Sequence, residues 1–479
     1  MSLTWPLEPS VPVTDRLRAG DGRHDRPATA VSSPADPAPV HAANLVDAAR
    51  LRAAGVEVVV TVSAAGRNRV AVEADLAAAA DIGAAVLLDP SDGVDLTASQ
   101  LHALARYAGL RVAGWEPAGP GAARPPVRTR PVDRTSAPCP KHLAHGPCGG
   151  VGPDGGCEVP TGPRQCGFLA TPPTAIPPTA MPVTAPTAAP PTAAAIELGR
   201  IAERRPLVVS GFPAHPMDSD SVAICAETLR ETCDAALAGD SGRARTQFPP
   251  SYRALLMARA GVRAWAGVNC RDRGTEALRV ELEALRTAGA AAVHCVTGDH
   301  PALGDRPDAT GVFELEGSTL IPAARASGHL VSFAESPLAP PRPDRPLRAA
   351  RKAVAGGRFC LLQYAGEPAA TAEFVTALAA VAPTPVGVLP GVPLVIDRPG
   401  ALLLRDFVGS ALPAGYLERV LDAADPVRAG IRAAVALGGE LLAIDRVAGV
   451  VVAGGARRGD EAEYAAALAT VCRELGGGS

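Results

Sequence analysis

The chain has 479 residues, of which 47% are hydrophobic and 20% charged, and its formal net charge is −3. This is the composition of a folded protein long enough for two or three domains, and so small a net charge gives no electrostatic reason to expect nucleic acid or an anionic membrane as a partner. Aromatic residues make up only 3%, so a stacking platform for single-stranded nucleic acid is not expected either.

The N-terminal residues do not show the basic start and apolar core of a signal peptide. No apolar run reaches the roughly 20 residues that a membrane-spanning helix needs. We therefore expect a cytoplasmic protein. In that reducing compartment its 10 cysteines are expected to be free, buried or metal-bound more often than disulfide-linked.

Residues 1–40 are rich in Pro, Ala, Asp and Arg without periodicity, which predicts a disordered arm. Residues 41–117 alternate helix and strand patterns, and this alternation predicts parallel β/α units. The expected elements are helices at 45–54 and 70–80 and strands at 56–62 and 84–88.

The same segment is similar to a later part of the chain. Three pieces match in order: Ala54-Gly55-Val56 with Ala260-Gly261-Val262, Gly66-Arg67 with Asp272-Arg273, and Gly83-Ala84-Ala85 with Gly289-Ala290-Ala291. The segment is far too short for an eight-stranded barrel, which takes about 250 residues. It is either the remnant of a repeated barrel, which must pack against something else, or an independent alanine-rich β/α unit.

A Pro/Arg-rich linker at 118–135 leads to a cysteine-rich module at 136–170, whose four cysteines each stand nine positions after the last: Cys139, Cys148, Cys157 and Cys166. Thiolates on glycine-rich turns can converge on a metal ion, so we expect a four-cysteine metal site. The spacing lacks the C-x2-C pairs typical of zinc, so zinc, a [4Fe–4S] cluster and no metal all stay open. His142 or His145 could replace one thiolate.

A Pro-, Thr- and Ala-rich stretch at 171–194 predicts a semi-rigid tether. From 195 to 475 strand and helix patterns alternate again, and eight candidate strands predict one (β/α)8 barrel. The expected strands are 206–210, 235–238, 262–268, 290–296, 330–334, 359–364, 385–389 and 449–452.

The strand at 290–296 runs into Thr297-Gly298-Asp299-His300-Pro301. In a parallel α/β barrel the loops that follow the strands form the active-site face, so Asp299 is well placed for chemistry. Gly and Asp before Pro are also ordinary turn residues, so a turn without catalytic function is the alternative.

These motifs resemble the methylenetetrahydrofolate reductase family. The resemblance rests on Val268-Asn269-Cys270-Arg271-Asp272-Arg273, the following helix with Leu278, Leu282 and Leu285, and the segment that ends in Thr297-Gly298-Asp299-His300-Pro301. The Cys-Pro-Lys, Gly-Pro-Cys-Gly-Gly and Cys-Glu-Val elements resemble the cysteine-rich module beside some barrels of that family. The resemblance implies a flavin-dependent barrel that interconverts 5,10-methylenetetrahydrofolate and 5-methyltetrahydrofolate in one-carbon metabolism.

The resemblance also implies roles for single residues. Asp299 would assist hydride and proton transfer near the flavin, Gln363 would contact the folate, and Lys352 would help hold the flavin phosphate. Gln363 could equally be a strand-end amide, and Lys352 a cation favoured at a helix C-terminus. Either FAD or FMN fits, NAD(P)H or a protein partner would supply electrons, and a homo-oligomer is expected. The cofactor-binding residues so implied are Asn269, Thr297, Gly298, Asp299, His300 and Lys352.

The chain departs from the family at the acid that protonates the pterin. Gly211 stands where the family's first strand carries Glu, and Gly267 where its third strand carries His. Because a general acid needs an ionisable group, Glu335, Asp240 or water is left as the proton donor. Two alternatives to a reductase therefore stay open. One is a catalytically decayed folate-binding or scaffold homologue whose cysteine module docks a partner subunit, and the other is a folate-dependent methyl-transfer protein.

Overall fold

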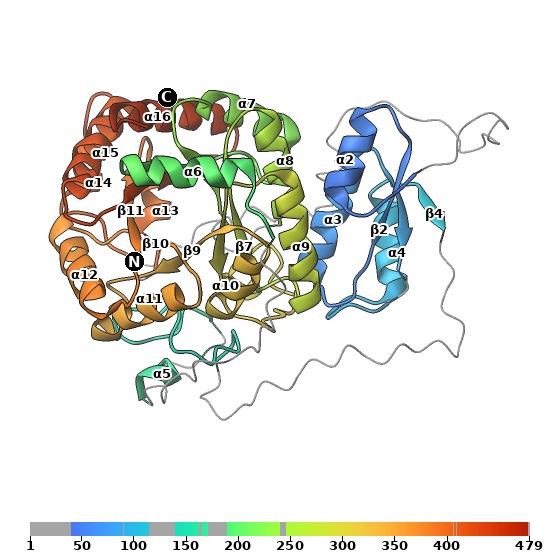
Figure 1. Ribbon diagram of the computed structural model, residues 1–479, viewed down its shortest axis with the longest axis horizontal. Coiled ribbons are helices and arrows are strands. Elements are labelled where there is room, and N and C mark those ends of the chain that lie inside the picture. The colour runs from blue at the N-terminus through green and yellow to red at the C-terminus, as the bar shows by residue number, and fades with distance from the viewer. Residues whose placement is uncertain are drawn as a thin grey trace.

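The structure, a computed structural model, describes residues 40–89, 91–114, 139–160, 162, 165–170, 189–239, 246–405, 407–408 and 410–477. The predicted arm up to residue 39, the predicted linker at 118–135, most of the predicted tether and Asp240 lie outside these residues. The described chain forms a four-stranded sheet, a cysteine-rich segment and a closed barrel (Figure 1).

The barrel consists of eight parallel strands that close in the order β10-β11-β12-β5-β6-β7-β8-β9. All eight strands expected from the sequence are present, so the prediction of a (β/α)8 barrel is confirmed. Their bounds are β5 Leu207–Gly211, β6 Ala235–Ala238, β7 Ala264–Asn269, β8 Ala292–Val296, β9 Leu330–Glu335, β10 Phe359–Leu362, β11 Gly387–Leu394 and β12 Gly449–Gly454.

Helices surround the barrel because each buries one apolar stripe against the strands. In α9 the buried stripe includes Leu278, Leu282 and Leu285, and the helix ends at Gly289, whose φ of 83° is a conformation that glycine adopts without strain. The helices are α7 Ser219–Leu229, α8 Pro250–Arg259, α9 Thr275–Ala288, α10 Gly317–Ala326, α11 Arg345–Val354, α12 Pro368–Val381, α13 Arg398–Arg405, α14 Tyr416–Leu421, α15 Pro426–Leu442 and α16 Glu461–Glu474.

Helix α6 (Ala193–Arg204) closes the N-terminal end of the barrel, and it begins inside the predicted tether. Its Leu198 and Ile201 pack into the cluster that fills the barrel interior, which also holds Trp265 of β7 and Phe359 of β10. The opposite, C-terminal end of the barrel is therefore the one that stays available for a ligand.

Two apolar clusters show which strand side chains point into the barrel and which point outward to the helices. Ala292 of β8 and Leu361 of β10 belong to the interior cluster, whereas Val293 and Phe333 belong to the cluster under the outer helices. Because successive side chains of a strand point to opposite faces, these residues fix the direction of the polar side chains nearer the strand ends.

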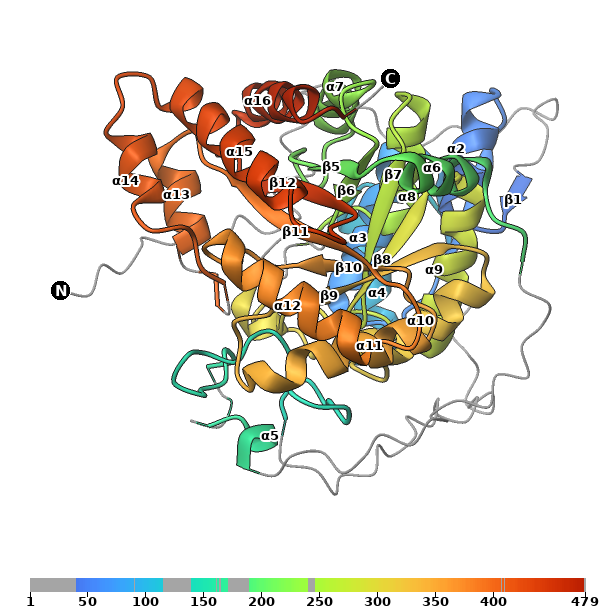
Figure 2. The same cartoon turned by 60° about the vertical axis from the view of Figure 1, so that its left-hand side comes forward.

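The N-terminal unit, residues 40–114, is a parallel sheet in the order β1-β2-β3-β4 that lies beside α8 and α9 (Figures 1 and 2). Its expected helices and strands are present, and it has three further elements, β1, α4 and β4. Its elements are β1 Val40–Ala42, α2 Leu45–Ala53, β2 Val58–Val62, α3 Arg69–Ile82, β3 Ala85–Leu88, α4 Ala98–Tyr107 and β4 Val112–Gly114.

Among the described residues, no helix is long and apolar enough to cross a membrane.

Candidate functional site

The turn after β8 holds Asp299 at the C-terminal end of the barrel. Gly298 has a φ of 89°, which favours glycine. Thr297 Oγ1 accepts a hydrogen bond of 3.0 Å from the backbone N–H of Gly317, and His300 Nδ1 accepts one of 3.1 Å from the N–H of Ala302. Side chains on both sides of the half-buried Asp299 thus fix the turn.

Two predicted site residues face the barrel interior near this turn. By strand alternation Asn269 points to the same side as Trp265, and Gln363, just after β10, to the same side as Leu361. Asn269 Oδ1 accepts hydrogen bonds from the N–H groups of Arg271 (3.0 Å) and Asp272 (3.3 Å). Within the described chain, its amide nitrogen and the side-chain amide of Gln363 have no protein partner, so both can bind a ligand.

A third inward residue, His294 of β8, was not singled out in the sequence. Its Nδ1 lies 2.9 Å from Ser332 Oγ, which also accepts a hydrogen bond of 2.9 Å from Trp265 Nε1. Burial, with a smaller contribution from the charge of Lys352, lowers the pKa of His294 to about 4, so the ring is neutral at pH 7. Its Nε2 has no partner among the described residues. The alternation of β8, with Ala292 inward, was the signal that could have identified it.

The lowered pKa of His294 predicts a pH-dependent stability. The unfolded chain binds this proton near pH 6.5 and the folded chain only near pH 4. The free energy of unfolding should therefore fall as the pH drops from 6.5 to 4, by about 3 kcal/mol in total, and this loss should persist below pH 4. Urea unfolding across that range should show a shallower pH dependence in His294→Asn than in the exposed-residue control His41→Asn. Equal slopes would contradict the prediction.

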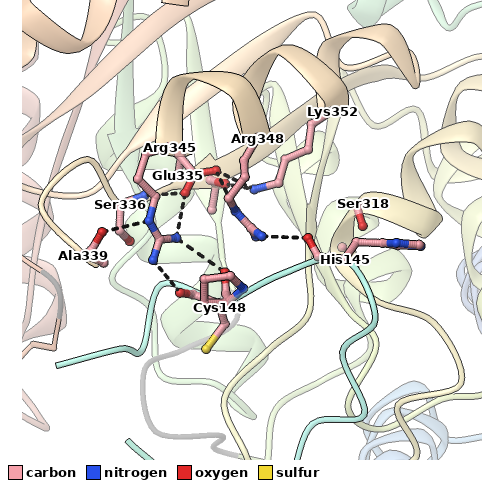
Figure 3. A network of polar contacts seen from close by, with 12 residues as sticks. His145, Cys148, Ser318, Glu335, Ser336, Ala339, Arg345, Arg348 and Lys352 are labelled. Carbon is pink, nitrogen blue, oxygen red and sulfur yellow. Dashed lines mark hydrogen bonds and ion pairs between the residues drawn. The ribbon is translucent and has the colours of Figure 1, made fainter. Parts of the chain in front are cut away.

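Glu335, predicted as a proton donor, faces away from the barrel interior. It lies on the same side of β9 as Phe333 and pairs with three cations of α11, shown in Figure 3: Arg345 at 3.1 Å, Arg348 at 3.9 Å and Lys352 at 3.0 Å. Burial raises its pKa, but the three cations outweigh burial and lower the pKa to about 2. An ionised carboxylate outside the barrel cannot protonate a ligand in the mouth, so this geometry does not support the predicted role.

Lys352, predicted to hold the flavin phosphate, is largely engaged with the protein. Its Nζ donates to Ala334 O at 2.7 Å and to Glu335 Oε2 at 3.0 Å, which leaves one of three ammonium donors. Burial is the largest cause of a lowered pKa of Lys352, and the charge of Arg348 lowers it further. The charge of Glu335 acts in the opposite direction but does not outweigh them. Three cations around one carboxylate leave a surplus of positive charge, but this surplus is buried on the outer side of β9.

The same arginines clamp the cysteine-rich module onto the barrel. Arg345 Nη2 donates to Cys148 O at 3.1 Å, and Arg348 Nη1 donates to His145 O at 2.8 Å (Figure 3). His145 Nε2 also lies 3.6 Å from a carboxylate oxygen of Glu316. The module is therefore docked through its backbone at the end of β9 and the start of α11.

The docked module lies next to the turn that carries Asp299. Lys141, which pairs with Glu158, is close enough to Asp299 for the two charges to interact. The rings of His142 and His300 both contact Phe313, at centroid distances of 6.4 and 6.0 Å. The structure thus brings together two sites that lie far apart in the sequence, the cysteine module and the barrel mouth.

The four module cysteines are free thiols in this structure. Burial raises the pKa of Cys148 to about 11, and burial together with Cys139 and Cys157 raises that of Cys166. Across the part of the chain that is described, no three His, Cys, Asp or Glu side chains form a group that could hold a metal. The residues as placed do not fit a bound metal, and the four-cysteine site stays a prediction that metal analysis tests.

Comparison with known proteins gives a likeness of fold only. No protein-family model and no curated protein matches the sequence. Among solved structures, an uncharacterized protein from Clostridium thermocellum that binds two copies of 5-methyl-5,6,7,8-tetrahydrofolic acid is 13% identical, with a TM-score of 0.44, over 57% of this chain and 97% of that one.

Two enzymes show a weaker likeness. Oxaloacetate acetylhydrolase is 14% identical with a TM-score of 0.35, over 55% of this chain and 80% of the enzyme. For 2,3-dimethylmalate lyase, a member of the PEP mutase/isocitrate lyase superfamily, the values are 14% and 0.34, over 54% and 80%. At these scores none of the three indicates a ligand or a reaction for this chain.

Proposed function

We propose that this chain binds a reduced folate at the C-terminal mouth of the barrel and, with a flavin, interconverts 5,10-methylenetetrahydrofolate and 5-methyltetrahydrofolate. The observation that carries the proposal is that four polar side chains lie on or directly after barrel strands toward their C-terminal ends, namely Asp299 on its fixed turn and the inward-facing Asn269, His294 and Gln363. A pterin ring offers amide, amine and ring-nitrogen groups, and a carboxylate, two amides and an imidazole nitrogen can pair with them.

Each group has a task in this proposal. Asp299 accepts hydrogen bonds from the N–H groups of the pterin and assists proton transfer there, and Gln363 both donates to and accepts from the same ring. The turn Thr297–His300 and Asn269 would hold the flavin, because they lie at the mouth, whereas Lys352 is engaged with Glu335 on the outer side of β9. Bound flavin supplies the hydride, and NAD(P)H or a protein partner supplies its electrons.

A catalytically decayed folate-binding protein is the second candidate, and Gly211 favours it. A Cβ atom at Gly211 would lie 3.0 Å from Cβ of Ala453, the neighbouring residue of β12. The space in which the family's glutamate would begin is thus partly filled by another side chain. The chain lacks the acid and has also adapted its packing to that absence.

Restoring this carboxylate should increase reductase turnover. The double variant Gly211→Glu/Ala453→Gly places a carboxyl on the inward face at the end of β5 and makes room for it. Because positioned acid catalysis contributes roughly 10² to 10⁴-fold, we expect at least about a hundredfold faster oxidation of 5-methyltetrahydrofolate than in the control Gly211→Gln/Ala453→Gly. Equal rates would favour the decayed folate-binding function.

Folate binding itself is tested by calorimetric titration of the purified protein with 5-methyltetrahydrofolate. Saturable binding of one equivalent is the expected result for either candidate. No binding, with or without added flavin, would exclude both.

A further inference from the structure

The N-terminal unit repeats part of the barrel at a constant offset. Helices α3 and α9 begin 206 residues apart (275 minus 69) and end 206 residues apart (288 minus 82). Strands β2 and β7 begin at the same offset, at Val58 and Ala264, and both helices end at a left-handed glycine, Gly83 with a φ of 72° and Gly289 with 83°. The succession α2-β2-α3-β3 thus corresponds to α8-β7-α9-β8.

The two repeats contact each other through equivalent positions. Arg67 and Arg273, which are equivalent at this offset, face each other in an isolated antiparallel bridge. The N–H of Asn68 donates to Asp272 O at 3.1 Å, and the N–H of Gly274 donates to Gly66 O at 2.6 Å. Exchanging the two repeats converts the first hydrogen bond into the second. Such an exchange is the mark of an isologous contact, the kind that two copies of one chain make about a two-fold axis.

The helices follow the same symmetry. Tyr252 of α8 donates its hydroxyl to Asp81 at the end of α3 at 2.6 Å. Arg50 of α2 donates at 2.6 Å to the carbonyl of Thr287, which is the equivalent of Asp81 at the end of α9. In each repeat the helix before the strand therefore contacts the C-terminal end of the helix after the strand in the other repeat.

Apolar side chains join the two repeats between these polar contacts. Val46 and Ala49 of α2 and Ala77 and Ala78 of α3 belong to the same buried cluster as Leu278 of α9. The unit is therefore packed onto the barrel as part of a continuous core.

The two repeats are related by an approximate two-fold axis that passes between Arg67 and Arg273, which we call the pseudo-axis. The charges around it are self-complementary. Asp75 of α3 lies 3.0 Å from Arg273 and 3.4 Å from Arg67. Its equivalent in α9 is Glu281, which is close enough to Arg273 to raise the pKa of that arginine, as Asp75 also does against the cost of burial. A second barrel in place of the N-terminal unit would bring another Glu281 to the position of Asp75 and keep the charge pairing.

We propose that the α8–α9 face of the barrel is a self-association surface, and that the N-terminal unit occupies it in the same chain as a substitute for a second barrel. The chain is then a pseudo-dimer with one complete barrel, and this face cannot support the homo-oligomer expected from the family resemblance.

The N-terminal unit also contacts the loops that carry the candidate site. Asn68, fully buried, donates to Asp272 Oδ1 at 3.1 Å and Thr310 O at 3.0 Å, in loops that follow Asn269 and Asp299.

A cysteine pair at the pseudo-axis tests which chain occupies the face. Positions 67 and 273 form a non-hydrogen-bonded antiparallel pair, whose Cα atoms lie about 4.5 Å apart, within the range of a disulfide. Mild oxidation of Arg67→Cys/Arg273→Cys should give an intramolecular disulfide in a chain that light scattering shows to be monomeric. Arg273→Cys alone should stay unlinked, like the wild-type control with its 10 cysteines.

Three results would overturn the proposal at this stage. A covalent dimer of Arg273→Cys alone would place a second barrel on the face, a covalent dimer of the double variant would place another chain's N-terminal unit there, and no disulfide in the double variant would remove the contact itself.

The self-association half of the proposal needs a variant that uncovers the face. Glu73→Arg/Asp75→Arg sets new arginines against Arg306 and Arg67, and should release the N-terminal unit from the barrel, whose eight strands close without it. Combined with Arg273→Cys, this variant should double in mass and form a covalent dimer through position 273. A released variant that stays monomeric and unlinked would show that the face does not self-associate.

Discussion

Glu335→Gln should lower the free energy of unfolding by about 3–5 kcal/mol, the usual cost of removing one partner from a buried ion pair. The side chain of Glu335 is only 2% exposed. Among the described residues, its carboxylate is the only one that pairs with Arg345, Arg348 and Lys352. Without its charge, three clustered cations lose their partner in a place that water hardly reaches. Urea unfolding at pH 7 measures the loss.

The matched control is Glu283→Gln on the outer surface of α9. Glu283 pairs with Arg286, but the two side chains are 50% and 34% exposed, so the change should be within about 1 kcal/mol. Hydrogen exchange should also rise at residues 139–160 in Glu335→Gln, because Arg345 and Arg348 hold the module as well as the carboxylate. Equal stability of the two variants would show that Glu335 is not the centre of this network.

Asp299→Asn should reduce the oxidation of 5-methyltetrahydrofolate by roughly 10² to 10⁴-fold, the usual contribution of a positioned acid–base group. The amide keeps the size of the side chain, and the turn is fixed by Thr297 and His300, so the fold should be retained. Single-turnover rates with flavin-loaded protein measure the effect, and Asp445→Asn, on an exposed loop, is the control. Turnover that is unchanged by Asp299→Asn would remove Asp299 from the mechanism.

Periodicity was sufficient to predict the barrel. Each strand is a short apolar run between turn residues, and helices such as α9 carry a clear apolar stripe, so local pattern and tertiary burial agree. The shortest elements of the N-terminal unit, β1 and β4 with three residues each, were missed because so few residues carry no periodic signal.

The candidate site was only partly predictable, because side-chain direction depends on strand register. Asp299 and Gln363 could be placed at strand ends from the sequence. Glu335 also ends a strand, but its position relative to Phe333 turns it outward, where α11 supplies three cations. His294 shows the opposite case, because it was not predicted as a site residue and yet faces the interior. It lies in an apolar run, and only its alternation with Ala292 shows its direction.

Contacts between distant segments had no local signal at all. Arg345 meets the carbonyl of Cys148, nearly two hundred positions earlier in the sequence, and this hydrogen bond uses backbone atoms that any residue could supply. The internal repeat, by contrast, had a signal in the sequence. The sequence did not show that the equivalent residues Arg67 and Arg273 contact each other.

The measurement that tests the proposed function most directly is an anaerobic absorbance spectrum of the purified, flavin-supplemented protein before and after addition of 5-methyltetrahydrofolate. We predict that flavin co-purifies with the protein or binds to it when added. Its oxidised bands should bleach when the folate is added, because the methyl carbon of the folate would give a hydride to the flavin. A protein that binds no flavin, or whose flavin bands are unchanged by saturating folate, would contradict the reductase function.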